Sequence, residues 1–256
     1  MGNFGVKHLM GLGWLFTLII VLLVVLLLIK KKHQYGEKYD RGVIAGAALF
    51  IWFWEAVKTI VIFNSPLFAG AGLYPAFMLP FHICSMGLYA YWILGFHKGR
   101  VAAFIKPFSF ATLFLVTLLI LIIPASSGIM GDIPNWSFVE ANILPFQSFL
   151  YHGTLVFVPM YMVLSGFYKP HIKDIGKATL TLLITAIFAF GLNKILKVTD
   201  FMTLEYGNGN PFQFLLQRNY FLYILVLASI AIAGTSLFLL LGQWLSNRVH
   251  RQKKAS

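Results

Sequence analysis

Seven long apolar runs limit what this chain can fold into. Each contains at least the roughly 17 residues that an α-helix needs to cross the hydrocarbon core of a membrane. Charged residues make up only 11% of the sequence, whereas about a quarter of the residues in soluble domains are charged. The sequence therefore predicts an all-α, polytopic bundle of seven transmembrane helices. We expect the spans near residues 10–29, 42–63, 75–96, 107–124, 143–167, 178–197 and 219–245.

The positive charges predict an orientation for these spans. Most Lys and Arg residues fall in the connecting segments 30–41, 97–106 and 168–177 and in the tail 246–256. Segment 64–74 carries no charge, and segment 125–142 has only Asp132 and Glu140. Because Lys-rich and Arg-rich connections stay in the cytoplasm, we expect the N-terminus outside and the C-terminus in the cytoplasm. This pattern indicates a multi-pass protein of a cell membrane, by expectation the bacterial cytoplasmic membrane.

Composition also excludes several classes. The net charge of +12 is accounted for by the cytoplasmic connections, so no nucleic-acid partner is expected. The single cysteine, Cys84, allows no intrachain disulfide and no Cys-x-x-Cys zinc site. The first run is followed by Lys30, Lys31 and Lys32 instead of a small-residue cleavage site, which favours a retained helix. Without a visible repeat, residues 1–256 are interpreted as one membrane domain.

Ionisable or reactive side chains inside the spans are the candidates for function. Polar groups at membrane depth are costly, which makes a functional role the default hypothesis. Cys84 and His152 each lie nine residues from the outer end of a predicted span, or roughly 13 Å deep. Glu55 reaches nearly the same level, roughly 12 Å deep, from the second span. A thiol, an imidazole and a carboxylate from three helices are therefore expected to converge in the outer half of the membrane.

Each of these residues also has a structural interpretation. A lone cysteine in an apolar helix is usually a small hydrophobic residue. His152 can bond a carbonyl of a neighbouring helix. Glu55 and Lys58 are spaced i, i+3 and can neutralise each other as an ion pair. The shared depth favours function, because independent structural roles would not require the three groups to meet in one layer.

Other polar residues are weaker candidates. His82 precedes Cys84 by two residues, so on a helix the two side chains point about 200° apart unless Pro80 distorts the turn. Ser148 lies one turn before His152 and can orient its ring. Asn193, with two lysines after it, can hold a phosphate, although snorkelling lysines are the more ordinary interpretation. Segment 198–218 is either a lid over the bundle or an ordinary loop.

Several motifs together resemble a known family. These are Leu79-Pro80-Phe81-His82-Ile83-Cys84, the span from Phe108 to Pro124, Phe146-Gln147-Ser148-Phe149-Leu150-Tyr151-His152-Gly153, and Tyr168-Lys169-Pro170. In this order they resemble the YwaF-like bacterial integral membrane proteins. That family is similar to transmembrane protein 164, a eukaryotic acyltransferase that moves fatty acyl chains between phospholipids through a cysteine. Where the family tends to have an Asn-Tyr pair after the sixth span, this chain has Thr199-Asp200-Phe201.

The resemblance implies a reaction and its residues. Cys84 would be the nucleophile, and His152, with His82 nearby, would supply the base. Membrane phospholipids and lysophospholipids would then be the partners, with no cofactor and no metal. From their own positions in the spans, and not from the resemblance, Glu55, Lys58, Ser148 and Asn193 are expected to support the site or bind substrate.

Three alternatives stay open from the residues themselves. One is a haem or zinc site built from His82, Cys84, His152 and Glu55. Another is a small-solute transporter whose route is lined by Glu55, Lys58 and Asn193, although no internal symmetry is visible. The last is a structural or scaffolding role.

Overall fold

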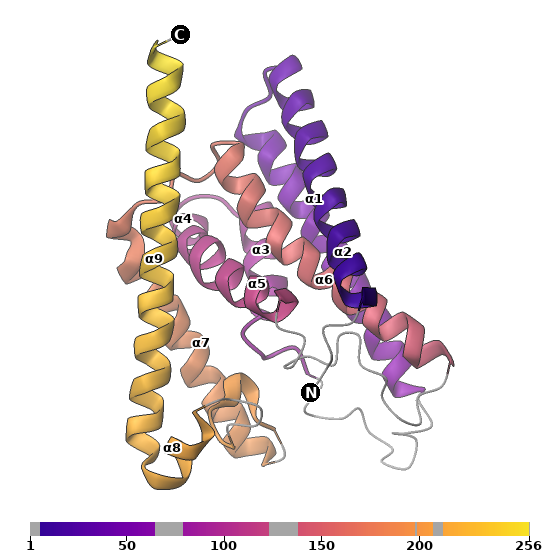
Figure 1. The fold of residues 1–256 in the computed structure, drawn as a ribbon, viewed down its shortest axis with the longest axis vertical. Helices are drawn as coiled ribbons and strands as arrows, with labels where there is room; N and C mark the ends of the chain where they lie inside the picture. The colour runs from indigo at the N-terminus through magenta and orange to yellow at the C-terminus, as the bar shows by residue number, and fades with distance from the viewer. Residues whose placement is uncertain (1–5, 65–78, 123–137, 198, 207–211, 256) are drawn as a thin grey trace.

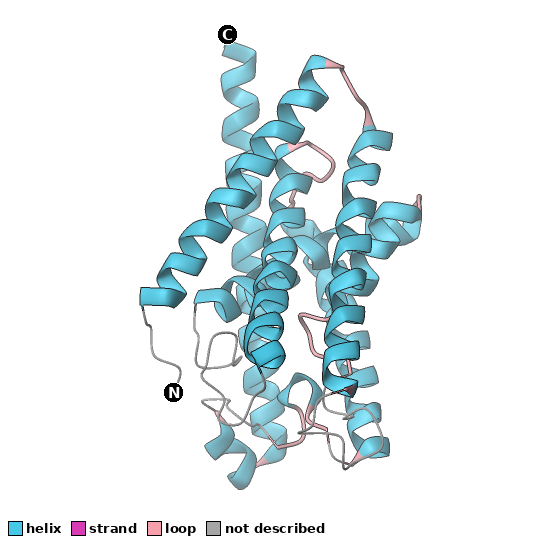
Figure 2. Ribbon diagram, turned by 90° about the vertical axis from the view of Figure 1, so that its right-hand side faces the viewer, coloured by secondary structure: helices cyan, strands magenta, loops and turns pink. Residues whose placement is uncertain are grey.

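The computed structural model describes residues 6–64, 79–122, 138–197, 199–206 and 212–255. Within these residues the chain is helical and has no strand (Figure 2). Five described segments are long and apolar enough to cross a membrane: Leu9–Lys32, Glu37–Phe63, Arg100–Leu121, Ile172–Leu196 and Tyr220–Asn247. The predicted all-α membrane fold is therefore confirmed in its class. The count of seven spans stays a prediction.

One side of the molecule is built from three long helices. α1 (Val6–Lys32) and α2 (Glu37–Phe63) form an antiparallel hairpin, and α6 (Phe138–Leu164) packs against both (Figure 1). Each of the three has 27 residues, which corresponds to about 40 Å of helix. These helices match the first, second and fifth predicted spans.

The other side consists of α7 (Ile175–Leu196) and α9 (Tyr220–Ala255), which run antiparallel and contact each other (Figure 1). A single 3-10 turn, η5 (Ile172–Asp174), leads into α7. Between α7 and α9 lie the 3-10 turn η6 (Phe201–Thr203) and the short helix α8 (Gln213–Arg218). The sequence left open whether the polar segment 198–218 is a lid or a loop. Residue 198 and residues 207–211 of this segment lie outside the described residues.

A continuous helical element joins the two sides. It consists of α4 (Arg100–Pro107), the π-helical segment η3 (Phe108–Leu113) and α5 (Phe114–Ile122). The widened π turns follow directly on Pro107, whose ring lacks an N–H to donate. η3 contacts α7 and α9, whereas α5 contacts α6. The predicted fourth span thus begins earlier than expected, and its last two residues, 123 and 124, lie outside the described residues.

The third predicted span is wrong over part of its length. A helix was expected through residues 75–96, but α3 (Met86–Phe96) has only 11 residues, and residues 79–85 form bends and turns. Pro80 explains the difference, because it cannot donate an N–H and disfavours helical backbone at Leu79 before it. Residues 75–78 lie outside the described residues. Cys84 therefore precedes a helix instead of lying within one.

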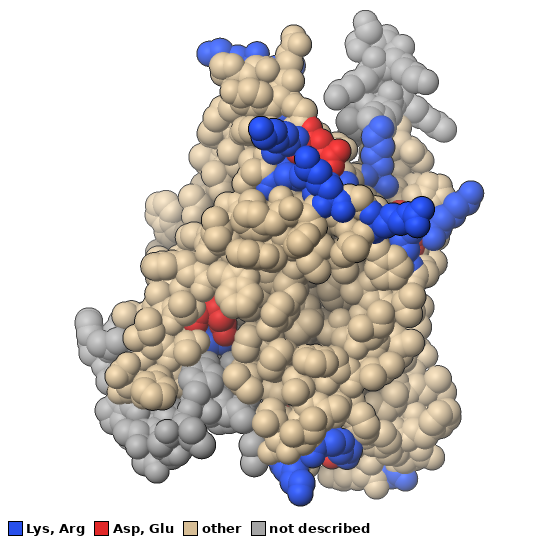
Figure 3. Space-filling model, turned by 180° about the vertical axis from the view of Figure 1, so that it is seen from behind, with Lys and Arg blue, Asp and Glu red and all other residues tan. Residues whose placement is uncertain are grey.

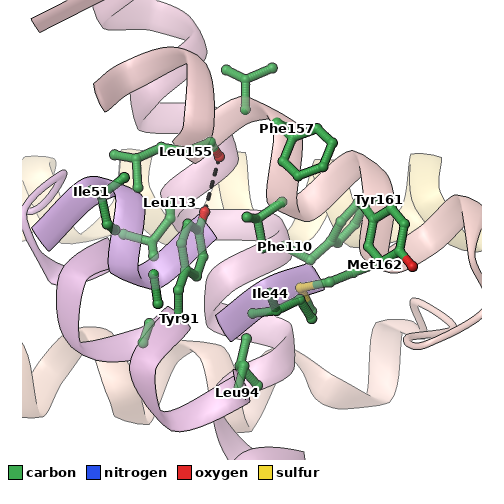
Figure 4. Close-up of a cluster of buried hydrophobic side chains, with 14 of the residues drawn as sticks. Ile44, Ile51, Tyr91, Leu94, Phe110, Leu113, Leu155, Phe157, Tyr161 and Met162 are labelled. Carbon is green, nitrogen blue, oxygen red and sulfur yellow. Dashed lines mark hydrogen bonds between the residues drawn. The ribbon is translucent and has the colours of Figure 1, made fainter. Parts of the chain in front are cut away.

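The buried core holds α3 between its neighbours. Tyr91 of α3 is fully buried, and its hydroxyl donates to the backbone carbonyl of Leu155 in α6 at 3.0 Å (Figure 4). A buried hydroxyl needs such an acceptor, so this bond fixes the rotation of α3 against α6. Apolar side chains from α2, α3, η3 and α6 pack around it, including Ile44, Ile51, Leu94, Leu113 and Met162.

Two glycines allow α3 to approach closely. A Cβ at Gly87 would lie 2.2 Å from Cδ2 of Leu155 in α6. At Gly95 it would lie 2.7 Å from Cα and 2.8 Å from the backbone nitrogen of Ala45 in α2. Both ends of α3 are thus seated on neighbouring helices at distances that only glycine permits.

Charged side chains tie the helices together at the end where α9 ends. In Figure 3 most of the visible Lys and Arg lie toward this end, a smaller group lies at the opposite end, and few charges lie on the surface between them. Lys30 of α1 pairs with the buried Asp40 of α2 at 2.6 Å and donates to the carbonyl of Ser165. The Tyr161 hydroxyl of α6 donates to the same carboxylate at 2.8 Å. Arg41 donates to the carbonyls of Leu94 and His97.

Candidate functional site

A cavity of about 1200 Å³ lies between the two sides of the molecule. Its volume is above the range of about 300–1,000 Å³ that is usual for small-molecule sites. Six of the seven residues selected from the sequence line it: Glu55, Lys58, His82, Cys84, Ser148 and His152. The seventh, Asn193, does not. Side chains of α7 and α9 form the opposite, largely apolar wall.

Cys84 lies immediately before the start of α3. It is the sole cysteine of the chain, a free thiol, and half-buried. Ser85 occupies the N-cap position of α3, and the first turn is closed by Gly87 N–H donating to the Cys84 carbonyl at 3.0 Å. The positive end of the α3 dipole therefore lies next to Cys84 in the chain.

His152 is buried in the middle of α6 with a defined hydrogen bond. Its Nδ1 lies 2.7 Å from the backbone carbonyl of Ser148, one turn earlier, and 3.3 Å from the Ser148 hydroxyl. Because a carbonyl oxygen can only accept, Nδ1 carries the proton. Nε2 is then the unprotonated nitrogen. A neutral imidazole with this tautomer has the lone pair that a general base requires.

Glu55 and Lys58 form the charged part of the wall. The Lys58 ammonium lies 2.5 Å from a Glu55 carboxylate oxygen, across one turn of α2. This ion pair was the structural interpretation of the two residues, and the structure shows it. Lys58 is also close enough to act electrostatically on Cys84 and His152. The pair thus brings a cation near the thiol in an otherwise apolar region.

Tyr151 is a site residue that the sequence analysis missed. It lines the cavity, its ring is buried, and its hydroxyl lies 3.5 Å from the Cys84 carbonyl. Tyr151 thereby connects α6 to the turn that carries the thiol. Its position beside His152 was the available signal, but a tyrosine in an apolar span is ordinarily read as packing.

His82 and Cys84 both line the cavity, although on a regular helix they would point apart. The non-helical backbone of residues 79–85 removes that restriction. The His82 ring lies edge-on to Phe201, with ring centroids 5.2 Å apart. His82 is therefore part of the wall where the segment after α7 meets the turn before α3.

Asn193 clamps that segment from inside α7. Its Oδ1 accepts from Phe201 N–H at 2.8 Å and from the Thr199 hydroxyl at 3.0 Å, while its Nδ2 donates to the Phe201 carbonyl at 3.1 Å. The side chain is 1% exposed. Asn193 thus holds residues 199–201 in place, and Asp200, Met202 and Thr203 of the same segment line the cavity.

The model of the TMEM164 family matches residues 3–239, nearly the whole chain. The chain belongs to the TMEM164 family. No curated protein and no solved structure matches it. The resemblance inferred from the motifs is confirmed at the level of the family. Together with the apolar helices, it identifies a multi-pass membrane protein.

The part of this TMEM164 family chain that the structure describes does not assemble a metal site. Among the described residues, no three His, Cys, Asp or Glu side chains come close enough together to hold an ion. The zinc set that the sequence left open, with His82, Cys84, His152 and Glu55, is therefore not formed as a cluster. These residues share a cavity without sharing a coordination centre.

Proposed function

We propose that this TMEM164 family member is a membrane acyltransferase that moves a fatty acyl chain from a phospholipid to a lysophospholipid through a thioester on Cys84. The observation that carries the proposal is one intramembrane cavity lined by the chain's only thiol and by a histidine whose Nε2 is unprotonated. A thiol and a base that line one cavity are the two groups that covalent catalysis uses. The family's resemblance to a cysteine acyltransferase supports the same reaction.

The first half of the reaction forms the thioester. His152 Nε2 takes the proton of the Cys84 thiol, and the sulfur attacks the ester carbonyl of the donor phospholipid. The carbon–oxygen ester bond breaks, and His152 returns the proton to the departing glycerol oxygen. A lysophospholipid leaves, and the acyl group stays on sulfur.

The second half reverses these roles. The hydroxyl of an acceptor lysophospholipid attacks the thioester while His152 takes its proton. The carbon–sulfur bond breaks, and the proton goes to the thiolate of Cys84. The positive end of α3 and the ammonium of Lys58 favour the oxyanion that forms in both halves.

The surroundings favour a lipid donor and transfer over hydrolysis. We propose the N-terminus outside, the C-terminus in the cytoplasm, and the cytoplasmic membrane of a bacterium as the location. The cavity then lies where ester carbonyls of outer-leaflet phospholipids can reach, and far from cytosolic acyl-CoA. Its apolar wall would limit water, the competing acceptor.

The test is a labelled-lipid assay with purified protein. Phospholipid with a radiolabelled acyl chain and unlabelled lysophospholipid are added, and labelled adduct and labelled product are measured. We expect a hydroxylamine-sensitive adduct on Cys84, with no adduct and no transfer for Cys84→Ala. His152→Ala should lower the rate by about 10²–10⁴-fold, the usual contribution of a general base.

Thr154→Ala is the matched control, because Thr154 lies two residues from His152 on α6 but does not line the cavity. It should keep normal transfer. Unchanged transfer by Cys84→Ala would overturn the proposal, and transfer to water alone would make the protein a lipase. Substrate uptake that survives Cys84→Ala would instead support the transporter hypothesis.

A further inference from the structure

The apolar wall of the cavity opposite Cys84 has a distinct composition. Leu182 and Ala186 of α7 and Leu227, Ala228 and Ala231 of α9 line this part of the cavity. Three of these five side chains are single methyl groups. The wall therefore leaves room for a ligand along α7 and α9, and its chemistry suits hydrocarbon.

The order of the lining residues gives this wall a direction. α7 runs away from the charged end of the molecule, and α9 runs back toward it (Figure 1). Thr179 on α7 and Ile232 on α9 are thus the lining residues of these helices nearest the charged end, and Ile224 is among those nearest the other end. From Ile224 to Ile232, the cavity follows α9 for about 12 Å.

The polar lining lies toward the opposite end. The segment that follows α7 contributes Asp200, Thr203 and Tyr206 to the lining. It begins at the end of α7 that lies away from the charged end of the molecule. In the proposed orientation this is the outer side. A phospholipid of the outer leaflet has its headgroup at that side and its chains directed toward the middle of the membrane, so a chain whose ester lies at Cys84 extends along α7 and α9.

We propose that the inner end of the cavity, between α7 and α9, binds the terminal part of the transferred acyl chain, and that the small side chain of Ala231 sets the longest chain accepted. Ala231 is half-buried and lies one helical turn beyond Leu227 on the same face of α9. A larger side chain there takes up part of the apolar space that α7 and α9 line. This inference rests on the proposed acyl transfer.

The test compares chain lengths in Ala231→Phe and in the milder Ala231→Leu. The donors are phosphatidylcholines with lauroyl, palmitoyl or stearoyl chains, and the acceptor is kept constant. Ala231→Phe should transfer lauroyl chains within about threefold of the wild-type rate and lose at least about tenfold on stearoyl chains, since each methylene that no longer fits costs roughly 10–200-fold. Ala231→Leu should show a smaller shift in the same direction.

Ala233→Phe is the matched control. Ala233 is exposed, lies about 200° around α9 from Ala231, and does not line the cavity. It should leave the chain-length profile unchanged. The inference would be overturned if both Ala231 variants lost transfer equally on all chain lengths, or if neither changed. Transfer by the wild-type protein would still support the proposed function.

A binding measurement separates the two proposals. In a Cys84→Ala background, native mass spectrometry measures how much lauroyl and stearoyl phosphatidylcholine the protein retains. The acyl site predicts that adding Ala231→Phe lowers retention of the stearoyl lipid selectively. That result, together with no transfer by the wild-type protein, would reject the proposed reaction and keep the acyl site, whereas equal retention of both lipids would reject the acyl site.

Discussion

His152 obtains its ring hydrogen bond from its own helix. The acceptor is a backbone carbonyl one turn earlier, so any residue at position 148 would supply it. The sequence spacing allowed Ser148 to orient this ring. Both contacts of the ring nitrogen are made by Ser148, and the shorter one is to its main-chain carbonyl. The tautomer therefore follows from local helix geometry. The position of Nε2 relative to other groups depends on how α6 packs.

Asn193 shows how a polar residue in a span can be used internally. The sequence allowed it to bind a phosphate at the outer surface, yet its amide oxygen and nitrogen are engaged by Thr199 and Phe201. These partners are six and eight positions later in the chain. Such a bond depends on the chain turning back over the end of α7, which residue spacing alone does not reveal.

We therefore expect Asn193→Ala to destabilise the protein. The substitution leaves the buried N–H and carbonyl of Phe201 without their partner, and each such group costs about 1–3 kcal/mol. Thermal unfolding in detergent should show a clearly lower midpoint. Asn64→Ala is the control, because Asn64 is exposed and donates to one carbonyl within its own turn. An unchanged midpoint for Asn193→Ala would show that the clamp contributes little.

Among the elements, α3 has the strongest influence on the site. Its late start after Pro80 places Cys84 before the helix, next to the positive end of the dipole. Its glycines at positions 87 and 95 set its separation from α6 and α2. Tyr91 fixes its rotation through the Leu155 carbonyl. The position of the thiol against α6 is thus determined by how α3 is seated.

Gly95→Ala tests this seating. The added Cβ would meet the backbone of Ala45, which cannot turn aside as a flexible side chain can, so α3 and α2 must separate. We expect a loss of about 1–3 kcal/mol, as for other overpacked cores, measured as a lower thermal midpoint. Gly46→Ala on α2 has no neighbour within 4 Å and should be neutral or slightly stabilising. Equal midpoints for the two variants would contradict this account.

At the scale of the whole molecule, charge is concentrated at one end. The buried Asp40 there joins α1, α2 and α6 through Lys30 and Tyr161. The same end carries the connections that are rich in Lys and Arg. Charged residues at the end that predicts the orientation thus also hold three long helices together. At the opposite end, the segment after α7 lines the cavity.

The orientation itself is open to a labelling test. In a Cys84→Ala background, Lys98→Cys reports on the charged end and Gln217→Cys, on α8, reports on the other; both positions are exposed. A membrane-impermeant maleimide should label Gln217→Cys in intact cells and Lys98→Cys only after permeabilisation. The reverse pattern would show that the N-terminus faces the cytoplasm.

Much of the architecture could be predicted from the sequence. The apolar runs indicated where α1, α2, α6, α7 and α9 lie, because a helix in a membrane must satisfy its own backbone groups and cover a fixed thickness. The helical rise also predicted similar depths for Cys84, His152 and Glu55. The structure shows that all three line one cavity, although Cys84 precedes its helix. The third span was the exception. Its hydrophobicity predicted one long helix, but Pro80 interrupts it, and the helix begins only at Met86.

The sequence thus determined which segments form long apolar helices, and only the tertiary structure decided which of their side chains become neighbours. Tyr151 reaches the Cys84 turn, and His82 lines the same cavity as Cys84 because the backbone there is not helical. Asn193 turns inward to clamp its own loop. The physical reason is that the rise per residue is fixed by backbone hydrogen bonds, whereas the rotation and separation of helices depend on side chains that meet from distant parts of the chain.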